Sequence, residues 1–114
     1  MVRVTEVYKS LLEGIIGDLN IGNYRFLVDD HFIQRTAERL IRPTDVDKIL
    51  RKFDQVTADL SALDVGDPFW FVDKTLNVAL AMRKKDEKTY IMKTVVWTER
   101  DPYSQGVDKY IYVH

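Results

Sequence analysis

Five side chains that can exchange protons or hold anions recur at helical spacing near the middle of the chain. They are His31, Arg35, Glu38, Arg39 and Arg42. At about 100° per residue they share one side of a helix, opposite an apolar side. An imidazole moves protons near neutral pH, and guanidinium groups bind phosphate oxygens through paired hydrogen bonds. The stripe therefore suits an anionic partner, and RNA is the partner that we expect.

These residue types match the needs of metal-independent RNA cleavage. That reaction requires a base for the 2′-hydroxyl, an acid for the leaving 5′-oxygen and cations for the charge on phosphorus. His31 is the candidate proton carrier, and Glu38 would act as the base if its surroundings raised its pKa. Arg35 and Arg39 would clamp the phosphate. The alternative is a solvated helix face on which the arginines pair with Glu38 and nearby aspartates.

A second candidate lies in a later strand. Lys93 stands between apolar residues of a predicted central strand, where a lysine is unusual. Arg83 ends the neighbouring strand of the same hairpin, and Thr94 is expected on the opposite face from Lys93. Lys93 either belongs to a site or extends its amine past the edge of the sheet. The candidate catalytic residues are thus His31, Glu38, Arg83 and Lys93, and the candidate nucleic-acid-binding residues are Arg35, Arg39, Arg42 and Lys93.

Aromatic residues of the second half offer faces on which unpaired bases could stack, or they pack in the core and at its edges. These residues are Trp70, Trp97, Tyr103, Tyr110 and Tyr112.

Composition excludes several other chemistries. The 114 residues include no cysteine and only two histidines, and the net charge is −1. Cysteine-ligated zinc and thiolate catalysis are therefore absent, and a site with several histidine ligands is not expected. No phosphate-binding glycine motif occurs. Adjacent acids at Asp29 and Asp30 are typical helix caps. We expect no metal and no cofactor, and any nucleic-acid site must be a local basic patch.

Helices are predicted in the first half. A helix from Thr5 to Ile16 is followed by a turn, and the stripe-bearing helix starts at Asp29 or Asp30. That helix should end at Arg42, because Pro43 disfavours helical geometry in the residue before it. Thr44 is the expected cap of the next helix. The buried residues expected on these two helices are Phe32, Ile33, Thr36, Ala37, Leu40, Ile41, Val46, Ile49, Leu50 and Phe53.

Strands dominate the second half. Alternation or β-branched and aromatic runs predict strands at 24–28, 69–72, 76–83, 89–97 and 110–113, with a charged hairpin loop at 84–88. The fold class is α+β, with N-terminal helices packed on a four- to five-stranded, mainly antiparallel sheet. We expect a single domain over 1–114, made of a helix and turn (1–22), a core (24–97), and a loop with a last strand (98–114).

The core resembles the RelE and BrnT toxin-like domains of the barnase–EndoU–colicin–RelE group of compact RNases. The matching residues are His31, Arg35, Glu38, Arg39, Val46 and Leu50, followed by FWFVDKTLNVAL and YIMKTVVW. The resemblance extends from Tyr24 to Trp97. It implies metal-independent RNA cleavage by basic and polar side chains on the sheet and adjoining helix, although many members of the group are inactive or serve other uses.

Two functions from different classes follow. The first is an RNA-binding or ribonuclease-like domain. The second is a non-catalytic protein-binding module of similar fold, acting as an inhibitor or adaptor. The expected partners are RNA or a protein, such as a cognate antitoxin or another target, and not a membrane. With no cysteine and no apolar N-terminal run, we expect a cytoplasmic protein.

Overall fold

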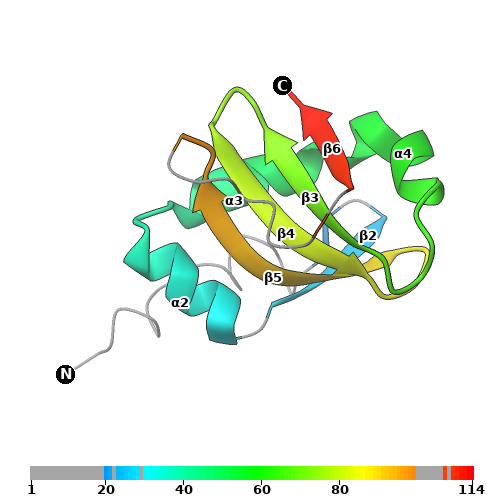
Figure 1. Ribbon diagram of the computed structural model, residues 1–114, viewed down its shortest axis with the longest axis horizontal. Helices are drawn as coiled ribbons and strands as arrows, with labels where there is room; N and C mark the ends of the chain where they lie inside the picture. Colours follow the sequence, from blue (N-terminus) through cyan, green and yellow to red (C-terminus); the bar gives the residue numbers. More distant parts are fainter. Residues whose placement is uncertain (1–19, 22, 29, 100–106, 108) are drawn as a thin grey trace.

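The computed structural model describes residues 20–21, 23–28, 30–99, 107 and 109–114 (Figure 1). Four helical segments lie between two short strands and a β-meander. The elements are β1 (Asn20–Ile21), β2 (Tyr24–Val28), α2 (Asp30–Glu38), α3 (Pro43–Leu50), the 3₁₀ helix η1 (Arg51–Val56), α4 (Thr57–Ser61), β3 (Pro68–Asp73), β4 (Val78–Lys84), β5 (Thr89–Trp97) and β6 (Tyr110–Val113). This confirms the α+β class, while the helix predicted at Thr5–Ile16 lies outside the described residues.

The sheet is mixed, which corrects the prediction of a mainly antiparallel sheet. Its order is β1-β2-β5-β4-β3-β6. The hairpins β3–β4 and β4–β5 and the short β1–β2 pair are antiparallel, but β2 runs parallel to β5 and β6 runs parallel to β3. Parallel neighbours need long connections. The helices and the meander supply such a connection between β2 and β5, so hairpin signals in the sequence do not reveal it.

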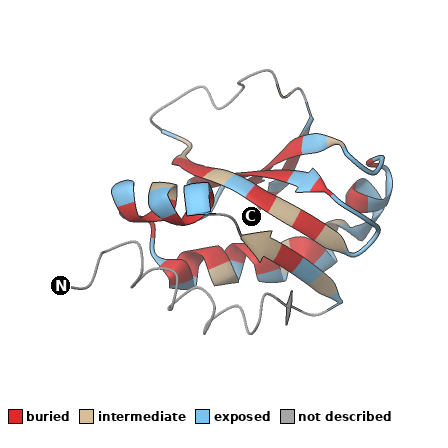
Figure 2. Ribbon diagram, turned by 90° about the horizontal axis from the view of Figure 1, so that it is seen from below, coloured by how far each residue is buried: buried red, intermediate tan, exposed pale blue. Residues whose placement is uncertain are grey.

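One face of the sheet packs against α3 and η1, which lie along it in Figure 2. The largest buried cluster joins these helices to alternate residues of the strands. Phe53 of η1 stands at its centre, with ring centroids 4.5 Å from Phe71, 4.9 Å from Phe26 and 5.2 Å from Tyr90. A smaller buried cluster on the opposite face contains Trp70, Val72, Ala79, Ala81 and Val96. The strand β4 is therefore buried on both faces.

The helix α2 packs beside the second half of β5. The ladder between β2 and β5 ends at Met92, so no strand flanks the following residues of β5 on that side in the described part of the chain. The Arg39 guanidinium donates a hydrogen bond to the carbonyl oxygen of Val95, and Trp97 Nε1 donates to the carbonyl oxygen of Arg39 at 2.7 Å. The helix thereby occupies the place of a further strand.

The end of α2 differs from the prediction. The helix stops at Glu38 instead of Arg42, and Leu40 has a φ of 54°. The N–H of Ile41 bonds to the Thr36 carbonyl at 3.1 Å, and the N–H of Leu40 bonds to the Ala37 carbonyl at 3.2 Å. This pair of bonds closes a helix through one left-handed residue. Leu40 is consequently 75% exposed, so its predicted burial is wrong, while Phe32, Ile33, Thr36, Ala37 and Ile41 are buried as predicted.

The start of α3 and the end of β4 also differ from the prediction. Arg42 is the residue that precedes α3, Pro43 opens the helix, and no side chain caps it, so the expected Thr44 cap is absent. Lys84, expected in a charged loop, is 1% exposed in β4. Its amine donates to the carbonyl oxygens of Leu60 and Leu63, both at 2.9 Å. Those carbonyls have a strong donor, which explains how a lysine is buried here.

None of the helices in the described part of the chain is long and apolar enough to cross a membrane.

Candidate functional site

Three of the predicted site residues line one pocket. Its volume is about 390 Å³, and His31, Arg83 and Lys93 all contribute to its wall. His31 comes from the first turn of α2, Arg83 from the end of β4 and Lys93 from the middle of β5. The hairpin places Arg83 opposite Ile91, and α2 places His31 beside the same strand. Residues more than fifty positions apart in the chain thus meet at one site.

A bulge in β5 shapes this wall. Ala81 pairs with Thr94 and Met82 pairs with Met92, so Lys93 is an extra residue in the ladder. Bulges disturb the alternation of faces and redirect side chains, and they are frequent beside functional sites. Both Lys93 and Thr94 line the pocket. The prediction that Thr94 lies on the opposite face from Lys93 is therefore wrong, and Thr94 joins the candidate site.

The other described residues of the wall are apolar. They are Pro68, Trp70, Ala81, Met82 and Val107. Trp70 is only 1% exposed, so it supports the pocket from beneath and offers no open face for stacking.

The electrostatic character of the pocket is basic. None of the described residues that line it is an aspartate or glutamate. Arg83 and Lys93 are exposed, and Arg83 makes no ion pair with another described residue. Two cations with an imidazole and no carboxylate favour an anionic ligand.

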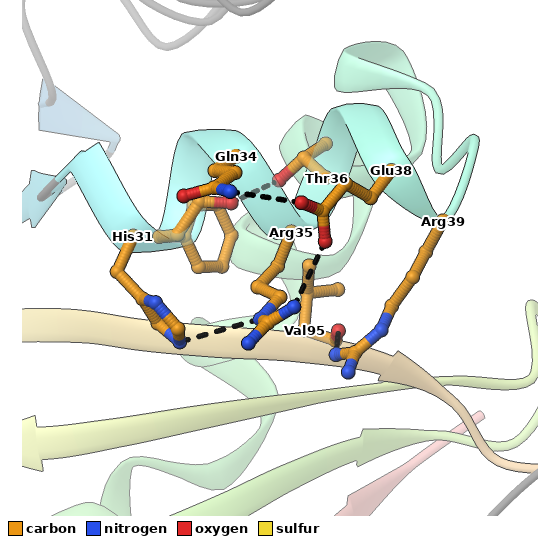
Figure 3. Close-up of polar contacts among 8 residues, drawn as sticks. His31, Gln34, Arg35, Thr36, Glu38, Arg39 and Val95 are labelled. Atoms are coloured by element: carbon orange, nitrogen blue, oxygen red, sulfur yellow. Dashed lines mark hydrogen bonds and ion pairs between the residues drawn. The ribbon is translucent and has the colours of Figure 1, made fainter.

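The other charged residues of α2 interact with one another beside the pocket (Figure 3). Arg35 NH1 binds Glu38 Oε2 at 2.8 Å, and Arg35 Nε lies 3.5 Å from His31 Nε2. Gln34 donates to the second Glu38 oxygen at 2.9 Å. The hydrogen bonds from Gln34 and Arg35 lower the pKa of the Glu38 carboxyl. Glu38 therefore lacks the raised pKa that a base role required, and it does not line the pocket.

The remaining arginines have separate roles. Arg39 is half-buried and holds α2 to β5 through the Val95 carbonyl, so it supports the fold. Arg42 lies beyond the helix and pairs with Asp45 at 3.3 Å, with 75% of its side chain exposed. Neither residue lines the pocket. Of the four residues proposed for nucleic-acid binding, only Lys93 reaches it.

The aromatic residues are mostly packed. Trp97 is half-buried, and its indole N–H is held by Arg39. Tyr112 is 46% exposed, stacks on Tyr110 with ring centroids 6.2 Å apart, and has the Lys74 amine 4.7 Å from its ring centre. Tyr103 lies outside the described residues.

Comparisons with known proteins give no assignment. No family model, no curated protein and no solved structure matches this chain. The likeness to RelE and BrnT domains thus stays a prediction from the sequence. The described residues also hold no group of three or more histidine, aspartate or glutamate side chains arranged for a metal ion.

Proposed function

We propose that the protein binds RNA at this pocket and cleaves it without a metal ion, as a small ribonuclease-like domain. The observation that carries the proposal is the meeting of His31, Arg83 and Lys93 in one pocket wall, whose described residues include no aspartate or glutamate. Arg83 and Lys93 supply positive charge for a phosphate, and His31 is the one imidazole in that wall. Arg35, 3.5 Å from His31, extends the basic surface along α2.

The chemistry assigned to each group is limited by the geometry. His31 Nε2 accepts a hydrogen bond from Arg35 Nε at 3.5 Å, so it carries a lone pair, and when substrate displaces this contact that lone pair can accept the proton of a ribose 2′-hydroxyl. The 2′-oxygen then bonds to phosphorus, the bond to the 5′-oxygen breaks, and water protonates that oxygen. His31 returns its proton to the resulting hydroxide. Arg83 and Lys93 stabilise the charge that develops on the phosphate oxygens.

Binding and cleavage are tested with one set of variants. Labelled single-stranded RNA is incubated in EDTA with wild-type protein, Arg83→Ala, Lys93→Ala and His31→Gln. Each lost phosphate contact should reduce the slope of log affinity against log salt by about 0.7. His31→Gln should retain affinity and lose cleavage, because a proton carrier acts on the transition state. The matched control is Lys48→Ala, which removes one exposed cation from α3, outside the pocket.

A different class of function has one observation in its favour. Leu40 is 75% exposed and adopts a backbone conformation that leucine rarely takes. Burial of this exposed side chain in the pocket of a protein partner would contribute hydrophobic free energy to binding. Wild-type protein that neither binds nor cuts RNA at low salt would contradict the nuclease proposal and leave the protein-binding module as the better hypothesis.

A further inference from the structure

The pocket has two kinds of lining. Arg83 and Lys93 are cationic and His31 is polar, whereas Pro68 and Ala81 of β3 and β4 are apolar and lie on the same face of the sheet as Arg83. A bare phosphate or a metabolite dianion would use only the first. A ligand that carries an anion next to a flat apolar group would use both.

The volume of the pocket further limits the class of ligand. A volume of about 390 Å³ lies near the lower limit of the ~300–1,000 Å³ that small-molecule pockets span. It accommodates one nucleotide and not a base pair with its two backbones. In an RNA duplex the base edges are paired and the bases are stacked, so a base reaches such a pocket only when it is unpaired.

The β5 bulge adds a polar residue, Thr94, to the pocket wall beside Lys93. Because Lys93 is the extra residue, Thr94 lines the pocket together with Lys93. A hydroxyl both donates and accepts hydrogen bonds. It can therefore bind a base edge while the neighbouring amine binds the phosphate of the same nucleotide.

We propose that the pocket takes one unpaired nucleotide of an RNA strand, with its base against Pro68 and Ala81 and its phosphate at Arg83 and Lys93. This inference rests on the proposed function, since it names the part of the RNA that the site recognises. A pocket of this kind would make the protein selective for single-stranded RNA over duplex RNA.

The test compares ligands that share phosphates and differ in their bases. Fluorescence anisotropy measures binding of labelled oligouridylate, alone and annealed to oligoadenylate. Unlabelled polyphosphate and uridine monophosphate serve as competitors. The free strand should bind more tightly than the duplex, because only an unpaired base can bury its face against Pro68 and Ala81. Polyphosphate and the mononucleotide should compete weakly.

Variants that fill the apolar part of the pocket provide the second arm. Ala81→Leu adds bulk from β4, and Thr94→Leu does so from β5 without changing charge. Each should remove the preference for the single strand and leave the weaker duplex binding intact. Ala58→Leu adds the same side chain at an exposed position of α4 and should change nothing. Thermal unfolding verifies that each variant is folded, and Thr94→Leu stands in if Ala81→Leu is not.

The outcomes separate the two proposals. Equal binding of strand and duplex, or polyphosphate competing as well as oligouridylate, would overturn the unpaired-nucleotide inference while RNA binding stands. A mononucleotide competing as well as the strand would also overturn it, because the pocket would then take free nucleotides. Binding of no RNA at all would remove both proposals.

Discussion

Leu40 allows a quantitative test of how α2 ends. The two replacements Leu40→Gly and Leu40→Ala both remove the leucine side chain, so its lost contacts cancel between them. A Cβ in the left-handed conformation costs about 1–2 kcal/mol, and Ala retains it whereas Gly does not. Gly in turn loses about 0.4–1 kcal/mol through its freer unfolded chain. Leu40→Gly should therefore be more stable than Leu40→Ala by about 0.5–1 kcal/mol.

The matched control is a position inside the same helix. Gln34 is exposed in α2, where Gly is less favourable than Ala by about 1 kcal/mol. The order of stability of the Gly and Ala variants should thus reverse between the two positions. Urea unfolding followed by Trp fluorescence measures all four variants, and the midpoints convert to free energy through a common m-value.

The absolute effect of Leu40→Ala is also informative. With the residue 75% exposed, about a quarter of its burial is lost, or roughly 0.5 kcal/mol. A buried leucine would cost about 2–5 kcal/mol. Two results would refute the assigned helix end by showing that the helix continues through Leu40. One is a loss of about 2–5 kcal/mol for Leu40→Ala, and the other is a Gly variant that is less stable than the Ala variant at both positions.

Three other predictions follow from the buried polar groups. Burial raises the pKa of Tyr90 to about 12, so the folded protein keeps a proton that the unfolded chain releases near pH 10. Stability should therefore fall between pH 10 and 12, and Tyr90→Phe should reduce this fall in pH-dependent urea unfolding, leaving the part that comes from Tyr24, whose pKa is also raised by burial. The same variant should cost little at neutral pH, because the buried hydroxyl has no hydrogen-bond partner. Arg39→Ala should destabilise the protein by about 1–3 kcal/mol, since it leaves the Val95 carbonyl without its charged donor; a loss near zero in urea unfolding would contradict the anchoring role. Lys84→Met should cost about 1–3 kcal/mol by orphaning the Leu63 carbonyl, since the Leu60 carbonyl also accepts the Leu63 N–H at 3.2 Å, and thermal unfolding that matches wild type would show that the Leu63 carbonyl is hydrated.

The local elements were largely predictable because their signals are local. The strand at 24–28 and the long strand at 89–97 follow from β-branched and aromatic runs, and both match the structure. The apolar side of α2 follows from helical spacing. The prediction for Leu40 is wrong because Leu40 has the helical spacing of Phe32, Ile33 and Ala37, but the helix ends before it. Periodicity identifies a face and does not show where a helix stops.

Features that depend on distant partners were not predictable. The parallel pairing of β2 with β5 joins residues some sixty positions apart, and no spacing rule encodes it. The bulge at Lys93 requires the pairing register of two strands, so Thr94 escaped notice as a site residue. The charged stretch 84–88 predicts a loop that includes Lys84. Its burial depends on the carbonyl groups of Leu60 and Leu63, which are more than twenty positions away in the sequence. His31, Arg83 and Lys93 were each selected by residue type, but their meeting depends on the tertiary fold.

The position of α2 beside β5 has a consequence for solubility. The residues that it covers, Thr94 to Trp97, are β-branched or aromatic and carry no charge. Such short segments self-associate through their backbones when an edge is free. Loss of α2 from this edge, through heat or through removal of the Arg39 guanidinium, would expose a template for strand pairing between molecules. The helix α2, which contains His31, thus also protects the protein from aggregation. Variants with substitutions in α2 should therefore be tested for aggregation by light scattering as well as for activity.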